Sequence, residues 1–224
     1  MLYELLLLLF SYLCGSIPVG YLIGKFFYNV DIRKHGSGNI GAANAFRLLG
    51  KKAGIGTMIG DMLKGAIATF TTRIYLWCGN YNGFGTYQSN NIILDSGFLL
   101  AMSALMAIIG HSYPVWLKFK GGKSASVGAG ALLGINPIAF TICFGVWVIA
   151  LIISRYTSLS NLITALTAPP LYWYFAGDRF FNNQSLWALY VSLVIVVFIY
   201  LRHHENIKRL IQGNERKFGQ KEKL

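Results

Sequence analysis

Long apolar runs that carry almost no charge recur along this chain of 224 residues. Hydrophobic residues make up 54% of the sequence and charged residues only 12%, about half of the roughly 25% usual in soluble domains. A chain in lipid must satisfy its backbone polar groups internally, and a helix does so within one segment. We therefore predict an all-α integral membrane protein. No repeat or long linker divides residues 1–224, so a single domain is expected.

Seven segments are candidates to cross the membrane. A spanning helix needs about 20 apolar residues, so the fourth candidate is short and decides the topology. The first lacks the basic flank of a cleavable signal peptide and is predicted to be a retained span. The candidates are 2–24, 53–78, 96–117, 124–133, 138–154, 162–176 and 186–201.

Positive charge orients these spans. Lysine and arginine are concentrated in three segments, 33–52, 118–123 and 202–223, whereas 79–95 has neither. The positive-inside rule places the three basic segments in the cytoplasm. They share that side only if the chain crosses twice between 124 and 154, and Asn136-Pro137 is a strong turn signal there. We predict seven transmembrane helices, with the N-terminus extracytoplasmic and the C-terminus cytoplasmic.

The net charge of +12 lies mostly in these short segments and the tail. In a membrane protein such charge sets orientation and meets anionic lipid, so membrane lipid is an expected partner and nucleic acid is not. Cys14, Cys78 and Cys143 lie within or at the ends of apolar runs, without the spacing of metal ligands. They are expected to act as small hydrophobic residues.

A segment rich in glycine and hydrogen-bond donors follows the first span. Gly38 and Gly41 allow the backbone to approach a ligand closely. Arg47 supplies a planar, permanently charged group that suits phosphate. The side-chain donors between them are Ser37, Asn39 and Asn44. Residues 37–47 are therefore predicted to bind an anion at the membrane edge.

A second polar cluster follows the third span and contains His111, Lys120, Gly121, Gly122 and Lys123. Paired glycines ahead of a helix leave backbone N–H groups available for an anion, and the helix dipole adds to the attraction. His111 lies near the end of a span, where a buried structural role is at least as consistent as a catalytic one.

The remaining clusters contain Ser158 and, after the last span, His203, Glu205 and Asn206. On a continuing helix His203 and Asn206 would share a face. Capping of a helix end by a cationic histidine is the alternative for His203. Glu205 is assigned to structure, paired with a nearby basic residue. The predicted topology places all four clusters on the cytoplasmic side, although only three were used to orient the chain.

Several kinds of chemistry have no residues to support them. No two acidic residues form a metal-binding pair at helical spacing within a polar cluster, and the Asp-rich array of membrane CDP-alcohol transferases is absent. The His-x4-Asp box of acyl-CoA acyltransferases is absent too. Cationic and neutral donors remain, which suit the binding of phosphate, so no metal and no cofactor are expected.

Taken together, the clusters resemble the PlsY family, bacterial membrane glycerol-3-phosphate acyltransferases that use an acyl phosphate donor. The resemblance covers essentially the whole chain. The departures are Ala43, where Thr is common, and Ser124, where Gly is common. Three motifs carry it: Ser37-Gly38-Asn39-x-Gly41-x-x-Asn44-x-x-Arg47; Gly110-His111-x-x-Pro114 with Phe119-Lys120-Gly121-Gly122-Lys123; and Arg202-His203-x-Glu205-Asn206-Ile207-x-Arg209-Leu210.

The resemblance implies acyl transfer from a fatty acyl phosphate to the 1-hydroxyl of sn-glycerol 3-phosphate, giving lysophosphatidic acid and phosphate. This is the first acylation step of phospholipid biosynthesis. It implies a bacterial cytoplasmic (inner) membrane location with the active site on the cytoplasmic face. Fatty acyl phosphate and glycerol 3-phosphate are the expected substrates. A cytosolic acyl phosphate synthase as a docking partner is left open.

Site roles follow from the same resemblance. The expected catalytic residues are Ser37, Arg47, His203 and Asn206. The expected substrate-binding residues are Gly38, Asn39, Gly41, Asn44, His111, Lys120, Gly121, Gly122, Lys123 and Ser158. The proton acceptor is either His203 or the donor's own phosphate, and the phosphate that each lysine contacts is left open. A phosphate-ester transporter or flippase is the rival, but all polar clusters lie on one face without a charge ladder across the membrane.

Overall fold

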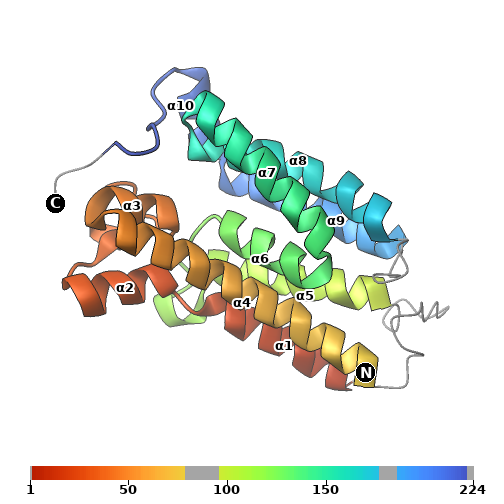
Figure 1. The fold of residues 1–224 in the computed structure, drawn as a ribbon. Helices are drawn as coiled ribbons and strands as arrows, with labels where there is room; N and C mark the ends of the chain where they lie inside the picture. The colour runs from red at the N-terminus through yellow and green to blue at the C-terminus, as the bar shows by residue number, and fades with distance from the viewer. Residues whose placement is uncertain (1, 79–95, 177–185, 221–224) are drawn as a thin grey trace.

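The computed structural model describes residues 2–78, 96–176 and 186–220, and every regular element in these ranges is a helix (Figure 1). The segment 79–95, used above for orientation, lies outside the described residues. The α-helices are α1 (Leu2–Ser16), α2 (Val19–Tyr28), α3 (Ala42–Leu49), α4 (Lys51–Cys78), α5 (Ser96–Ser112), α6 (Ala125–Ile135), α7 (Pro137–Ser154), α8 (Thr157–Ala176), α9 (Leu186–Arg202) and α10 (His204–Ile211). Two 3₁₀ turns are η1 (Ile32–Lys34) and η3 (Val115–Leu117).

The helices form layers (Figure 1). Helix α1 packs on α4 and α5, α4 packs on α6, and α5 packs on α9. Helices α7, α8 and α9 form the opposite layer, in which α8 contacts both of the others. The short helices α2, α3 and α10 lie at one end of the molecule, and the N-terminus lies at the other (Figure 1).

The first apolar run is not one helix, contrary to the predicted span 2–24. Helix α1 ends at Ser16 and α2 begins at Val19, with Pro18 as its N-cap. Proline has no N–H, and its ring clashes with the carbonyl four residues earlier, so a helix breaks there. The break leaves the Ile17 carbonyl outside the helical ladder, and the buried Lys64 Nζ donates to it at 2.6 Å.

The predicted turn within 134–137 is present. Asn136 separates α6 from α7, and its Oδ1 accepts a hydrogen bond from Ala139 N–H at 2.9 Å. Arg73 Nη1 donates to the carbonyls of Gly134 and Ile135, at 3.3 and 3.2 Å, and so caps the end of α6. Helix α6 has 11 residues, about 16 Å at 1.5 Å per residue, and is too short to span the hydrocarbon alone.

Helices α4 and α6 approach each other through glycines. A Cβ on Gly65 would overlap the Val127 carbonyl oxygen, and one on Gly130 would overlap that of Met62. Because neither glycine has a side chain, the two backbones come into direct contact, as in small-residue interfaces of membrane helices. Gly54 of α4 packs in the same way against α3, because a Cβ there would overlap Phe46.

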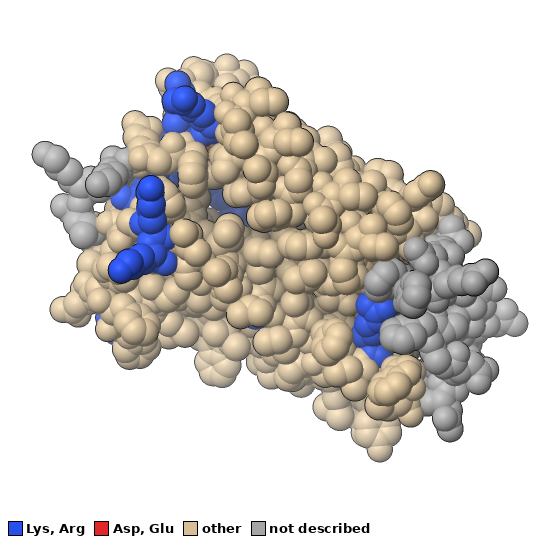
Figure 2. All heavy atoms as spheres, in the orientation of Figure 1, with Lys and Arg blue, Asp and Glu red and all other residues tan. Residues whose placement is uncertain are grey.

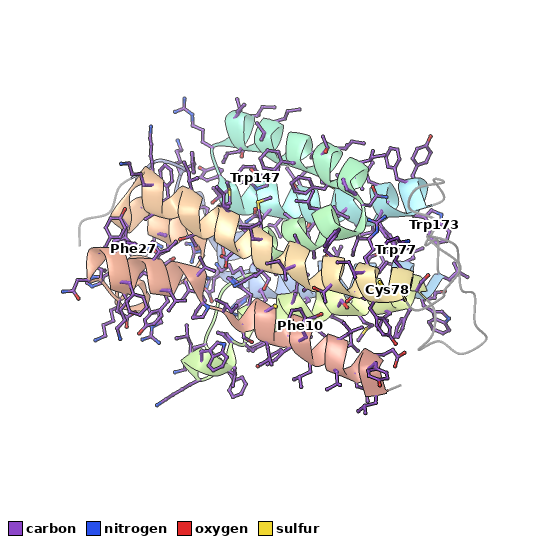
Figure 3. All side chains as sticks on the ribbon, turned by 60° about the horizontal axis from the view of Figure 1, so that its bottom comes forward. Phe10, Phe27, Trp77, Cys78, Trp147 and Trp173 are labelled. Carbon is purple, nitrogen blue, oxygen red and sulfur yellow. The ribbon has the colours of Figure 1, made fainter. Side chains whose placement is uncertain are left out.

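The outer surface is apolar. Among the described residues, three segments are long and apolar enough to cross a membrane, and α9 with α10, bent by 60°, makes a fourth if the pair counts as one span. The three segments are Leu2–Tyr28, Ser96–Leu117 and Pro137–Ser154. Exposed large apolar side chains include Phe10, Phe27 and Trp77, which Figure 3 labels on α1, α2 and α4. So large an exposed apolar surface is that of a protein in contact with lipid.

Candidate active site

One polar cavity of about 300 Å³ lies beside the ends of α3 and α10, and it is lined by residues from all four predicted clusters. Figure 2 shows basic side chains gathered at this end of the molecule and in the hollow between α4 and α7. The predicted site residues that line the cavity are Ser37, Asn39, Gly41, Asn44, Arg47, His111, Lys123, Ser158, His203 and Asn206. The predicted site residues outside the lining are Gly38, Lys120, Gly121 and Gly122.

The loop before α3 is folded around the buried side chain of Asn44. Its Nδ2 donates to the carbonyls of Ile32 and Asn39, both at 2.9 Å, and its Oδ1 accepts from Ser37 N–H at 3.0 Å. An amide with both ends engaged in this way shapes the loop. Asn44 therefore differs from its expected role as a direct donor to substrate, because its donors are already satisfied by loop carbonyls.

The same loop starts helix α3 at the cavity wall. Asn39 Oδ1 accepts from Gly41 N–H at 2.8 Å, and α3 begins at Ala42. Ala42 and Ala43 of its first turn line the cavity, where the N-terminal end of the helix dipole favours an anion. Arg47, on the same helix, also lines the cavity.

The glycine pair of the second cluster does not present free N–H groups, contrary to expectation. Gly121 N–H donates to the Ser112 carbonyl at 3.1 Å, and Gly122 N–H donates to the His111 carbonyl at 2.9 Å. These bonds fold the loop back onto the end of α5. Both residues must be small, because a Cβ on either would overlap atoms of His111. Their role is to let the loop pack against His111.

Of the two lysines left open by the sequence, only Lys123 lines the cavity, whereas Lys120 is exposed to solvent outside it. Lys123 Nζ donates to Asn206 Oδ1. Burial, and then the nearby Arg209 guanidinium, lower the pKa of Lys123 to about 8. Both effects disfavour the charged form of Lys123, whereas the negative charge of a bound phosphate would favour it.

His203 occupies the turn between α9 and α10, just beyond the apolar helix, and is buried. Its Nδ1 is 2.8 Å from the Ile199 carbonyl. A carbonyl only accepts, so the ring proton belongs on Nδ1 and Nε2 keeps a lone pair. Burial lowers the pKa of His203 to about 4, and the ring is neutral at physiological pH. The cationic cap considered as the alternative does not fit this state.

Glu215, beyond α10, is a site residue that sequence reasoning missed. Its carboxylate accepts hydrogen bonds from Ser158 Oγ at 2.9 Å, Asn206 Nδ2 at 2.6 Å and Arg209 Nε at 2.7 Å. Burial alone would raise the pKa of Glu215, but these three donors outweigh it and lower the pKa. The signal in the sequence is Gly213, a residue type that favours a turn. In the structure its φ is +71°, and the chain turns back there after α10.

The tail after α10 closes one side of the cavity. Phe218 N–H donates to the Arg155 carbonyl at 2.7 Å, and the Phe218 ring lies 4.7 Å from that of Phe46. With Glu215, these contacts join the start of α8, helix α10 and helix α3. The exposed Glu205 pairs instead with His204, at 3.3 Å, on the outside of α10.

An apolar cavity of about 160 Å³ adjoins the polar one. Both cavities are lined by Met58, Trp147 and Asn161, and Trp147 Nε1 donates to Asn161 Oδ1 at 2.8 Å. Figure 3 shows Trp147 between the layer of α7 and that of α4. The apolar cavity continues between α5, α6, α8 and α9, so the site offers adjoining polar and apolar compartments.

The polar compartment carries excess positive charge. Its lining includes four basic side chains, Arg47, Lys123, Arg209 and Arg216, and two acidic ones, Asp61 and Glu215. Among the residues that the structure describes, no group of three or more His, Cys, Asp or Glu side chains is placed to hold a metal ion. The arrangement suits an anionic oxygen compound.

A family model described as glycerol-3-phosphate acyltransferase matches residues 5–213. The chain belongs to this family. A glycerol-3-phosphate acyltransferase of Macrococcus caseolyticus is 39% identical over 95% of both chains. One of Desulforamulus reducens is 38% identical over 97% of this chain and 96% of its own.

Two solved structures of PlsY, an integral membrane glycerol 3-phosphate acyltransferase, have the same fold. The glycerol 3-phosphate form superposes with a TM-score of 0.79 at 33% identity, covering 97% of this chain and 96% of that one. The lysophosphatidic acid form gives 0.76 at 32% identity over the same shares. The resemblance to the PlsY family is confirmed, and the protein is an integral membrane protein.

Replacement of Glu215 by Gln tests the contribution of the tail. The neutral amide loses the ionic bond to Arg209 and turns N–H groups toward donors, so the free energy of unfolding should fall by about 1.5–3 kcal/mol. Thermal unfolding in detergent measures the change. Glu205→Gln is the matched control, because Glu205 and its partner are exposed, and it should shift stability by less than about 0.5 kcal/mol. Equal shifts in the two variants would contradict a buried role for Glu215.

Proposed function

We propose that this protein transfers a fatty acyl group from an acyl phosphate to the 1-hydroxyl of sn-glycerol 3-phosphate, forming lysophosphatidic acid and inorganic phosphate. The observation that carries the proposal is the cationic cavity that opens into an apolar one, in a member of the glycerol-3-phosphate acyltransferase family. Both substrates carry phosphate and one carries a long apolar chain, so each compartment has a matching ligand.

The phosphate groups bind to the basic side chains of the polar cavity in this proposal. Arg47 offers a two-pronged contact to phosphate oxygens, and Lys123 offers a point charge. The first turn of α3 and Ser37 add donors nearby. The acyl chain lies in the apolar cavity, which places the acyl carbonyl at the boundary lined by Met58, Trp147 and Asn161.

The transfer is a direct displacement. The hydroxyl oxygen of glycerol 3-phosphate forms a bond to the acyl carbon, and the bond from that carbon to the phosphate oxygen breaks. His203 Nε2 accepts a hydrogen bond from the attacking hydroxyl, and Asn206 holds glycerol 3-phosphate beside it. With a pKa of about 4, His203 is a weaker base than a phosphate group, whose second pKa is about 6. The departing phosphate therefore takes the proton, and His203 orients the hydroxyl.

We further propose seven crossings of a bacterial inner membrane within one domain, with the cavity on the cytoplasmic side. Helix α6 begins and α7 ends at the polar cavity, so the chain leaves and returns between them. The basic segments then share the cytoplasmic side. Reporter fusions within 134–137 are expected to report an extracytoplasmic site, and a cytoplasmic signal would contradict the topology.

Purified protein with palmitoyl phosphate and glycerol 3-phosphate should release inorganic phosphate and form lysophosphatidic acid, measured by phosphate assay and mass spectrometry. Palmitoyl-CoA in place of palmitoyl phosphate should give little product. Arg47→Lys keeps the charge but loses the planar contact, and its kcat/KM should fall at least about tenfold. Absence of product with both donors would overturn the proposed function, and equal use of palmitoyl-CoA would overturn the donor.

The pH dependence of the reaction should report Lys123. Its pKa of about 8 means that it is charged below pH 8 and loses its proton as the pH rises further. Substrate phosphate is fully ionised above about pH 7, so kcat/KM for palmitoyl phosphate should fall above pH 8, by about tenfold per unit at its steepest. A bound phosphate raises the pKa of Lys123, so kcat should fall at higher pH than kcat/KM. In Lys123→Arg, the alkaline fall should disappear, and its persistence would assign it to another group.

A further inference from the structure

A buried ion pair lies at the wall of the polar cavity and is not used by the reaction as proposed. Lys64 Nζ is 2.8 Å from Asp61 Oδ1, one turn earlier on α4. It also donates to the Ile17 carbonyl at 2.6 Å and lies 2.8 Å from His111 Nδ1 on α5. The exposed fractions of Asp61, Lys64 and His111 are 1%, 4% and 3%. Three segments of the chain therefore meet at one ammonium group.

These contacts determine the proton position on His111. An ammonium has three N–H groups and no lone pair. Lys64 forms an ion pair with Asp61, donates to the Ile17 carbonyl, and can act only as the donor in its contact with His111 Nδ1. His111 Nδ1 must therefore accept, which places the ring proton on Nε2. Asp61 Oδ1 lies 3.5 Å from Nδ1, too far to draw a proton onto it by a hydrogen bond.

The Nε2 edge of the ring lies at the substrate loop. A Cβ on Gly122 would overlap His111 Nε2, so that edge sits directly against the loop that carries Lys123. His111 lines the polar cavity together with Lys123 and Ala125, and Ala125 also lines the apolar cavity. Among the described residues, no protein group is hydrogen-bonded to Nε2. The Nε2–H is thus the donor that His111 offers to the polar cavity that it lines.

We propose that Asp61 and Lys64 are positioning residues that hold His111 as a fixed Nε2–H donor to an oxygen of the acyl phosphate. This rests on the proposed function. His203 is held in the opposite state, with its proton on Nδ1 and a lone pair on Nε2. One histidine then donates to the acyl donor, and the other accepts from the acyl acceptor.

Nitrogen-15 NMR of protein labelled at histidine tests the proton position without any activity measurement. The His111 signals, assigned by their loss in His111→Gln, should be those of a neutral ring with its proton on Nε2. In the double variant Asp61→Asn with Lys64→Met, which removes both charges together, Nδ1 loses its donor and the ring should become a mixture of the two neutral forms. A wild-type ring with its proton on Nδ1 would overturn the proposal.

Two conservative substitutions of His111 separate its ring nitrogens. Gln places its amide N–H₂ near the position of Nε2, and Asn reaches only the position of Nδ1. We expect His111→Gln to keep kcat/KM for palmitoyl phosphate within about threefold of wild type and His111→Asn to lose at least about tenfold. KM for glycerol 3-phosphate should change little in either. Equal loss in the two variants would mean that Nε2–H makes no contact with the donor.

The double variant supplies the matching kinetic result. Its kcat/KM for palmitoyl phosphate should fall about tenfold, with thermal unfolding and size-exclusion behaviour measured alongside, and an unchanged rate would overturn the positioning role. If the double variant does not fold, the wild-type NMR result and the Gln and Asn pair decide. An inactive wild-type protein would refute the proposed function, while the NMR measurement would still test the hydrogen-bond network separately.

Discussion

The structure depends on the pairing of one buried ammonium. Lys64 lies inside an apolar bundle, where a charge is tolerated only with a counter-charge and a full set of hydrogen bonds. Asp61 supplies the counter-charge, and the hydrogen bonds of Lys64 go to the Ile17 carbonyl, at the end of α1, and to His111 on α5. At the Pro18 break the Ile17 carbonyl therefore accepts from Lys64 as well as from Val19 N–H, at 3.1 Å, so it is paired although it lies outside a helix. The relative positions of α1, α4 and α5, and with them the cavity floor, follow from this contact.

The cavity wall is organised by a second anion. Glu215 accepts hydrogen bonds from Ser158 on α8 and from Asn206 and Arg209 on α10, and so fixes the positions of three side chains from two helices. The hydrogen bonds to Glu215 fix these side chains relative to one another. The lining has four basic side chains and two carboxylates, so it is net positive and attracts phosphate. Asn206 is fixed at both ends of its amide, by Lys123 and by Glu215, which orients it before a ligand arrives.

Local chemistry and charge parity predicted much of this from the sequence. The turn at Asn136 was predictable because Asn-Pro breaks a helix and because the basic tail needed an even number of crossings. The convergence of His203 with Lys123 followed only from topology and resemblance. Asn44 was assigned to substrate because its donors look available in sequence, whereas the fold directs them to loop carbonyls. Glu215 was missed because its three partners are brought to it only by tertiary structure.

The adjoining cavities provide the two environments that the proposed substrates require, one apolar for the acyl chain and one polar for the phosphate groups. A fatty chain is stable among apolar side chains, and a phosphate is stable among cations and donors. An acyl phosphate joins these two parts through a single carbonyl group, so a molecule bound with each part in its own compartment has that carbonyl at the boundary. Met58, Trp147 and Asn161 mark this boundary from three helices. Binding alone therefore positions the reacting carbon, which agrees with a site built from donors and cations rather than from a nucleophile.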